Sequence, residues 1–313
     1  MIEGQEGVSW EQWLALARAC EDHGVETMFR SDHYLSPSAP FQRDALDAWT
    51  TIGALAASTS TLRLGTLVSP ATFRHPSVLA KAAATADHVS GGRIELGLGA
   101  GWMELEHTAY GFAFPPTRER VELLAEQLEI VHGQWTQERF GFEGRHYRLA
   151  DSPALPKPVQ RPHPRLLVGG SGRRGTVVPA VRFADEYNTL LASPEDCRER
   201  RARLDAACEE AGRDPGSLAL SLMIGCLIGR DEGELRDRAR LLAERGYGPG
   251  ADADALLARY RERGVAGTPE QAAERLREFE AAGVERGMLQ QLLHDDLDQV
   301  ALIGRELAPA IGT

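Results

Sequence analysis

Short apolar runs rich in β-branched residues alternate along this chain with longer segments whose apolar residues recur at helical spacing. The segment 9–24 begins at Ser9, a typical helix N-cap, and repeats apolar residues every three or four positions. The pattern predicts strands over residues 26–33, 62–68, 93–99, 165–170, 186–191, 218–228 and 286–293. It predicts helices over residues 9–24, 44–59, 76–92, 117–135, 175–184, 194–212, 231–246, 252–263, 268–283 and 295–308, and a small hairpin over 139–149.

The alternation of strands and helices predicts an α/β protein with a mainly parallel sheet. Seven predicted strands and a stub, "MIEG", at the start favour a (β/α)8 TIM barrel, with a doubly wound open sheet as the alternative. No linker rich in Gly, Ser or charge divides residues 1–313, so one domain is expected. Departures from the repeat at about 102–116, 136–164 and 229–266 are predicted to be βα-loop insertions that build the active-site rim.

Composition narrows the class of protein. The formal net charge of −11 argues against nucleic acid or an anionic membrane surface as a partner. No apolar run reaches the roughly 20 residues of a membrane span, and the first residues lack the features of a signal peptide. The four cysteines form no C-x-x-C pair, which is typical of a reduced cytoplasm and gives no support for a structural metal. We therefore expect a soluble, cytoplasmic protein.

The first candidate chemistry lies at the end of strand 26–33, in "RSDHYLS", where Asp32 precedes His33. A carboxylate beside an imidazole can orient the ring, shift its pKa and allow general acid–base catalysis. The structural alternative is that both side chains only make local hydrogen bonds. Arg74 and His75, after the next strand, could meet a polar ligand or serve as solvated or capping residues.

Glycines follow strand 93–99 in "IELGLGAGW". The dinucleotide fingerprint G-x-G-x-x-G is absent, because its sixth position is Trp102. Glu104, Glu106 and His107 are polar candidates just beyond the turn. Their spacing matches neither H-E-x-x-H nor a two-His-one-carboxylate set, so no metal site is predicted.

A second glycine turn, "LLVGGSGRRGT", precedes a predicted helix and carries Arg173 and Arg174. Free backbone N–H groups, a helix N-terminus and guanidinium groups together can hold a phosphate; an ordinary turn with exposed arginines is the alternative. The chain has no Walker motif, no G-x-S-x-G elbow and no Cys–His nucleophile signature, so hydrolysis and phosphoryl transfer lack the necessary residues.

The chain resembles the bacterial luciferase-like superfamily, and within it the oxidoreductases that use the deazaflavin coenzyme F420. The matching stretches, in order along nearly the whole chain, are "ARACEDHGVETMFRSDHYL", "LRLGTLVSPATFRHPSVLAKAAATADHVSGGRIELGLGAGWMELEHTAYGF", "PKPVQRPHPRLLVGGSG" and "GTPEQAAERLREFEAAGVERGMLQ". The resemblance implies a (β/α)8 barrel that holds a flat tricyclic ring in its mouth, and a homodimer.

The resemblance also implies roles for particular residues. A non-prolyl cis peptide at Leu67–Val68 would back one face of the ring, and His33, near the ring with Asp32, would transfer the proton. The remaining cofactor contacts would be Gly99, Ala100 and Gly101 at the ring edge, Gly169, Gly170, Ser171 and Gly172 at the phosphate, and Arg173 near the acidic side chain of the coenzyme. The expected activity is hydride transfer between C5 of F420 and a small organic substrate.

Two departures from the family pattern stand out. The first strand is usually longer than "MIEG", and some relatives have a carboxylate where this chain has Trp102. Glu104 is the candidate to replace that carboxylate as a catalytic residue. Two alternatives stay open: a monooxygenase that takes reduced FMN from a separate flavin reductase and uses oxygen, and a non-catalytic relative that only binds a flavin.

Overall fold

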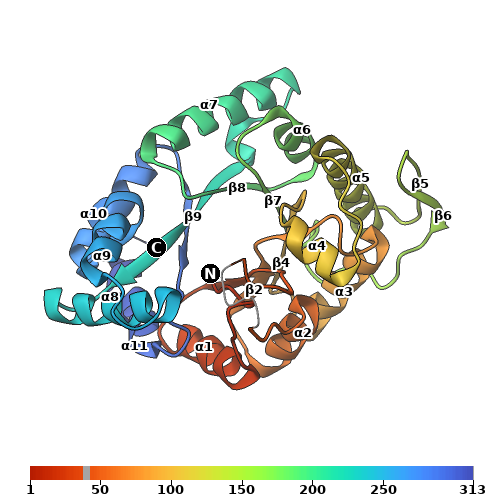
Figure 1. Cartoon of the computed structure of the whole chain (residues 1–313). Helices are drawn as coiled ribbons and strands as arrows, with labels where there is room; N and C mark the ends of the chain where they lie inside the picture. The colour runs from red at the N-terminus through yellow and green to blue at the C-terminus, as the bar shows by residue number, and fades with distance from the viewer. Residues whose placement is uncertain (38–42, 313) are drawn as a thin grey trace.

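The computed structural model describes residues 1–37 and 43–312 and contains a barrel of parallel strands ringed by helices (Figure 1). The strands of the wall, in spatial order, are β1 Thr27–Arg30, β2 Arg63–Thr66, β4 Ile94–Gly99, β7 Arg165–Gly169, β8 Glu186–Leu190, β9 Ala219–Ile228 and β11 Arg286–Gln290. Ile2 bridges Arg30 on one side and Gln291 on the other, so the stub at the start closes the ring between β1 and β11. The predicted (β/α)8 barrel is confirmed.

The helices lie close to their predicted positions because the local signals are strong. They are α1 Trp10–Asp22, α2 Ala48–Ser58, α3 Pro76–Ser90, α5 Thr117–Thr136, α6 Arg174–Phe183, α7 Pro194–Glu210, α8 Glu232–Tyr247, α9 Ala253–Arg263, α10 Pro269–Glu280 and α11 Leu297–Leu302. Ser9 forms a capping box with Gln12, and Gly91 ends α3 with φ 69. No helix in the described part of the chain is long and apolar enough to cross a membrane.

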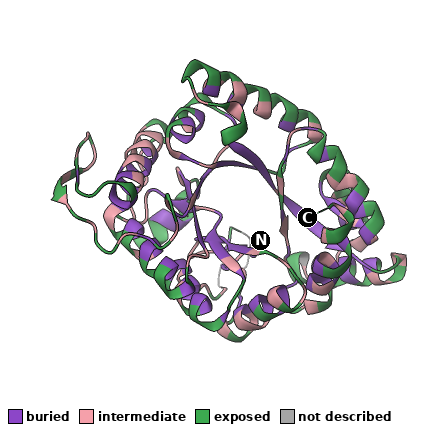
Figure 2. Cartoon of the chain, turned by 180° about the vertical axis from the view of Figure 1, so that it is seen from behind, coloured by how far each residue is buried: buried purple, intermediate pink, exposed green. Residues whose placement is uncertain are grey.

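Three further elements interrupt the repeat. The short helix α4 Glu104–Tyr110 and the short strand β10 Val265–Gly267, which pairs with β9, were not predicted from the sequence. The predicted hairpin is present as β5 Phe140–Glu143 and β6 Arg148–Ser152. The strands of the wall are mostly buried, while the outer faces of the helices are exposed (Figure 2).

The expectation that segment 136–164 helps to build the active-site rim is wrong. This segment follows α5, which carries the chain back to the amino-terminal ends of the strands before β7 begins. The hairpin β5–β6 therefore projects from the outside of the barrel, as Figure 1 shows. The other two insertions, 102–116 and 229–266, do supply residues to the cavity at the carboxyl-terminal face.

Buried charges fill the floor of the barrel. The Nη1 of Arg286 lies 2.7 Å from Oε2 of Glu95 and 3.3 Å from Oε2 of Glu186, and both carboxylates are at most 1% exposed. Arg63 also contacts Glu95, and Arg165 contacts Glu186. Buried anions of this kind are tolerated only while their cations remain in place.

The side chain of Val68 fills the space left by glycines on two neighbouring strands. The peptide bond Leu67–Val68 is cis, as expected, and separates β2 from the two-residue strand β3 Ser69–Pro70. A Cβ added at Gly97 would lie 2.9 Å from Val68, one at Gly99 would lie 2.6 Å away, and one at Gly169 would lie 3.1 Å away. The glycines therefore accommodate the bulge between β2 and β3.

We predict that Gly97→Ala destabilises the protein by about 1–3 kcal/mol, because the new methyl group collides with Val68 and with the backbone oxygen of Thr66. Gly53→Ala is the matched control: apart from its chain neighbours and the backbone of its own helix α2, no atom of the described residues lies within 4 Å of its Cβ position, and it should stabilise by about 0.5–1 kcal/mol. Urea unfolding measures both. Equal effects of the two substitutions would contradict the packing described here.

We predict that Arg286→Met lowers the free energy of unfolding by about 3–5 kcal/mol, because Glu95 and Glu186 then keep fewer cations in the barrel floor. Arg118→Met, at a side chain 90% exposed and paired with Glu122, should change it by less than about 1 kcal/mol. A loss below 1 kcal/mol for Arg286→Met would show that the buried pairs are not structurally required.

Candidate functional site

A cavity of about 1380 Å³ opens at the carboxyl-terminal face of the barrel. Its walls come from the ends of nearly all the strands, from the start of α4 and from the helical hairpin α8–α9. Active sites of TIM barrels are built at this face. Ligand cavities usually measure about 300–1,000 Å³, so this one has room for a large cofactor together with a second molecule.

His33 lines this cavity and is held by Glu106, which lies in α4. Nδ1 of His33 is 2.8 Å from Oε2 of Glu106, a carboxylate that is 0% exposed. The other oxygen of Glu106 accepts the backbone N–H groups of Tyr34 and Leu35. The carboxylate thereby joins the end of β1 to α4 and fixes the imidazole ring.

Only Nδ1 of His33 has a hydrogen-bond partner in the described part of the chain, so Nε2 is available to a ligand. Burial lowers the pKa of His33, but the hydrogen bond and the negative charge of Glu106 outweigh it, and the pKa is raised above its ordinary value. The indole ring of Trp102 stands edge-on to His33, with the ring centroids 5.6 Å apart. A fixed, readily protonated imidazole facing a cavity can act as a general acid.

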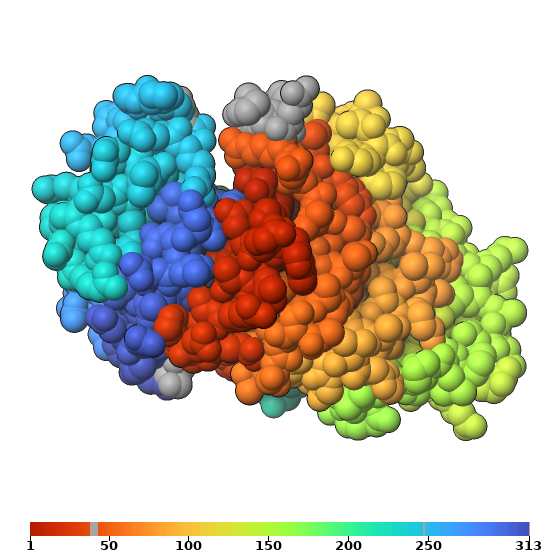
Figure 3. All heavy atoms as spheres, turned by 90° about the horizontal axis from the view of Figure 1, so that it is seen from below, coloured from red at the N-terminus to blue at the C-terminus, as the bar shows by residue number. Residues whose placement is uncertain are grey.

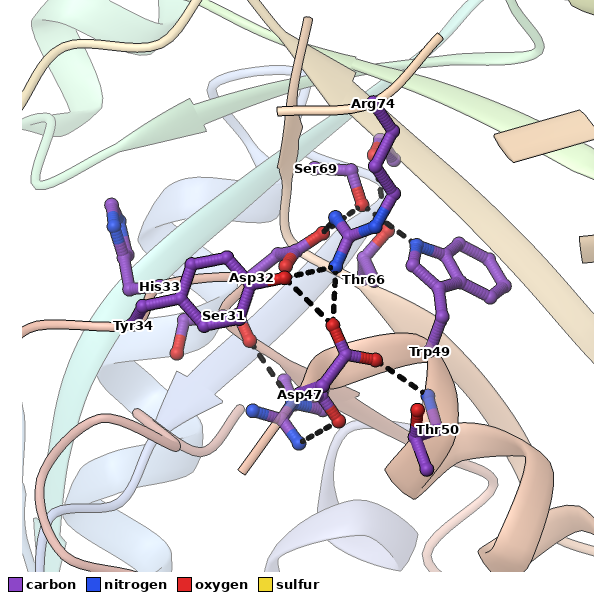
Figure 4. A network of polar contacts seen from close by, with 12 residues as sticks. Ser31, Asp32, His33, Tyr34, Asp47, Trp49, Thr50, Thr66, Ser69 and Arg74 are labelled. Atoms are coloured by element: carbon purple, nitrogen blue, oxygen red, sulfur yellow. Dashed lines mark hydrogen bonds and ion pairs between the residues drawn. The ribbon is translucent and has the colours of Figure 1, made fainter. Parts of the chain in front are cut away.

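Asp32 points to the opposite side of the strand end from His33, as Figure 4 shows. Its Oδ2 accepts hydrogen bonds from Ser69 at 2.6 Å and from Arg74 at 2.5 Å, while its Oδ1 has no partner within the described residues. Arg74 also contacts Asp47. Asp32 therefore does not line the cavity or contact the imidazole; it connects β1 to the bulge that precedes Ser69.

The structure separates the polar candidates that follow the first glycine turn. Glu104 is exposed and lies outside the cavity, whereas Glu106 is buried against His33. Both nitrogens of His107 are occupied, because Nδ1 bonds the carbonyl of Met103 at 2.7 Å and Nε2 bonds the hydroxyl of Thr72 at 2.6 Å. His75 accepts the N–H of Ser77 and caps α3, so the capping role given above as an alternative to ligand binding is the observed one.

The residues expected to contact one face and the edge of the ring do line the cavity. They are Leu67, Val68, Gly99, Ala100 and Gly101. The glycine positions, however, do not form an empty slot, since Val68 occupies the space beside Gly97, Gly99 and Gly169. The bulge at Leu67 and Val68 thus lines the cavity together with Gly99 and Gly169, which leave room for the Val68 side chain.

Most residues of the second glycine turn line the cavity. Gly169, Gly170, Ser171 and Arg173 line the cavity, but Gly172 does not. The N–H of Gly172 is donated to the hydroxyl of Tyr187 at 2.9 Å, which holds the turn in place. Within the described chain, the N–H groups of Ser171 and Arg173 have no acceptor, and Arg173 has no carboxylate partner.

These groups match the chemistry of a phosphorylated flavin or deazaflavin. Free N–H groups and a guanidinium at the start of α6 fit a phosphate, and the Val68 bulge offers a face for a ring. No group of three or more His, Cys, Asp or Glu side chains placed to hold a metal ion occurs within residues 1–37 and 43–312.

Comparison with known proteins places these features in a family. The model of the luciferase-like monooxygenase family matches residues 2–306. An F420-dependent glucose-6-phosphate dehydrogenase of Nakamurella multipartita is 38% identical over 185 residues, which are 56% of this chain and 50% of that protein. An FMNH(2)-dependent dimethylsulfone monooxygenase of Pseudomonas putida is 30% identical over 281 residues, 82% of this chain and 76% of that protein.

Solved structures share the fold. The coenzyme F420-dependent tetrahydromethanopterin reductase from Methanopyrus kandleri superposes with a TM-score of 0.80 at 18% identity, covering 99% of this chain and 98% of that one. The barrel, the cavity at its carboxyl-terminal face and the family match over residues 2–306 lead to one conclusion. The chain belongs to the luciferase-like monooxygenase family of oxidoreductases.

Proposed function

We propose that this protein is an F420-dependent oxidoreductase that transfers a hydride between the deazaflavin and a small organic substrate. The observation that carries the proposal is the His33–Glu106 pair, which presents a fixed proton donor to a cavity large enough for coenzyme and substrate. The relatives with F420 in their names support the choice of coenzyme.

In this proposal the turn after β7 holds the phosphate of the coenzyme. The N–H groups of Ser171 and Arg173, together with the Arg173 guanidinium, would bind its oxygens. Leu67 and Val68 would support one face of the ring, and Gly99, Ala100 and Gly101 would lie along its edge. When bound, the deazaflavin supplies a ring carbon, C5, that carries the hydride.

The chain itself supplies orientation and a proton. Nε2 of His33 would donate a proton to the oxygen of a carbonyl substrate during reduction and take it back during oxidation. Glu106 keeps the ring oriented and favours its protonated form. Trp102 covers one side of His33 and limits the directions from which a substrate can approach.

A second candidate is a monooxygenase that uses reduced FMN and oxygen. Its specific support is the dimethylsulfone monooxygenase match, which extends over 82% of this chain. The same phosphate turn and ring-backing bulge would serve FMN, so the two candidates differ in coenzyme rather than in the arrangement of these residues.

A fluorescence titration with oxidised F420 and, separately, FMN tests the proposed coenzyme. We predict micromolar binding of F420 and weaker binding of FMN. Arg173→Ala should weaken F420 binding about tenfold, since a charge-assisted contact is lost. Arg174→Ala is the matched control, because Arg174 lies outside the cavity and is 81% exposed beside Glu210. Tighter binding of FMN would favour the monooxygenase instead.

A pH profile of carbonyl reduction tests the proton donor. Because the pKa of His33 is raised, the protonated form should persist to higher pH than in an ordinary histidine, and the rate should fall as the pH rises through that pKa. Glu106→Gln removes the negative charge and should move this fall to lower pH by about one unit or more. Glu104→Gln, in the same helix but outside the cavity, should leave the profile in place. Equal shifts in both variants would exclude the assigned pair.

A further inference from the structure

We propose that the substrate is a neutral alcohol or carbonyl compound with an apolar chain or ring, bound against an apolar cavity wall that begins on β8, the strand beside the phosphate turn. This inference rests on the proposed hydride-transfer function and names the class of its substrate. The wall is formed by apolar side chains from β8, β9, the hairpin α8–α9 and the end of β11. These residues, called the leucine wall below, are Leu190, Leu191, Met223, Leu242, Leu256 and Leu292.

Two successive leucines of this wall are exposed to the cavity. Leu190 is 49% exposed and Leu191 is 63% exposed, although both line the cavity. Neighbouring residues of an extended strand point to opposite sides. Leu191 leaves the extended conformation, with φ 46, and so both leucines reach the same cavity. A positive φ is uncommon for leucine, and the result here is an apolar surface that a ligand would cover.

Two arginines that line the cavity, Arg245 and Arg43, are already engaged in ion pairs. Arg245 donates to Oδ1 of Asp295 at 2.6 Å and to the carbonyl of Leu292 at 3.2 Å. Arg43 is paired with Glu6. Committed guanidinium groups offer little to an anionic substrate, in contrast to Arg173 on the phosphate turn.

A carboxylate, Glu3, reinforces this preference for a neutral ligand. Glu3 lines the cavity between two amides, with Nε2 of Gln290 at 2.7 Å and Nε2 of Gln5 at 2.9 Å. Each amide donates to a different oxygen, which fixes the carboxylate and leaves it able to accept a hydroxyl hydrogen. An anionic substrate would instead meet the negative charge of Glu3.

Part of the leucine wall is packed within the hairpin α8–α9 and its neighbours. Leu242 and Leu256 belong to a small apolar cluster separate from the main core, together with residues such as Leu235 and Leu293. Figure 3 shows this hairpin, in cyan, standing across a notch from the red and orange amino-terminal segments. The hairpin can therefore define substrate specificity without altering the barrel that carries His33.

Equilibrium binding of methyl ketones with alkyl chains from ethyl to octyl tests the inference. Calorimetry with the oxidised F420 complex gives Kd without turnover, because oxidised coenzyme cannot reduce a ketone. Each added methylene should tighten binding by up to about fourfold. Octanoate and glucose-6-phosphate should bind at least about tenfold more weakly than the octyl ketone.

Leu191→Ser should flatten this chain-length dependence while leaving the Kd of F420 unchanged. Leu241→Ser is the matched control, since Leu241 is 52% exposed on α8 but does not line the cavity. The inference is overturned if Kd is independent of chain length, if either anion binds more tightly than the ketones, or if both variants respond equally.

When F420 fails to bind, the ketones are titrated into the protein alone. A retained chain-length dependence would then support the leucine wall while rejecting the proposed coenzyme.

Discussion

The site depends on one buried carboxylate. Glu106 is removed from water and receives hydrogen bonds from His33 and from the N–H groups of Tyr34 and Leu35. An isolated buried anion is strongly unfavourable, so these donors must stay together for α4 to pack where it does. The same bonds set the direction of the imidazole ring, raise its pKa and direct Nε2 to the cavity. Glu106 consequently links the position of α4 to the end of β1 and to the chemistry of His33.

Much of the fold could be predicted from the sequence because its local signals agree. The capping box at Ser9, the left-handed Gly91 and the alternation of strand and helix all point to a barrel. The failure at segment 136–164 has a physical cause: a loop length says nothing about which end of the barrel the loop occupies. Counting the intervening helix α5 would have shown that this segment lies at the floor.

The candidate site was only partly predictable. Adjacent positions at a strand end face opposite ways, so the sequence could have separated Asp32 from His33. Glu104 and Glu106 lie about 200° apart on a helix, and only one of them could face His33. Sequence alone could not choose between them, because the choice depends on how α4 packs. The side chain of Val68 fills the space beside the glycines at 97 and 99, and the sequence does not reveal this contact because it is made between strands.

The distribution of charge connects the site with its proposed ligands. Among the described residues, Arg173 at the phosphate turn has no carboxylate partner, whereas Arg245 on the hairpin side of the cavity is paired with Asp295. The most direct test of hydride transfer is an anaerobic reaction of a methyl ketone with reduced F420 that carries two deuterium atoms at C5. The account predicts that deuterium appears on the carbinol carbon of the product. Absence of label, together with turnover that requires reduced FMN and oxygen, would contradict it.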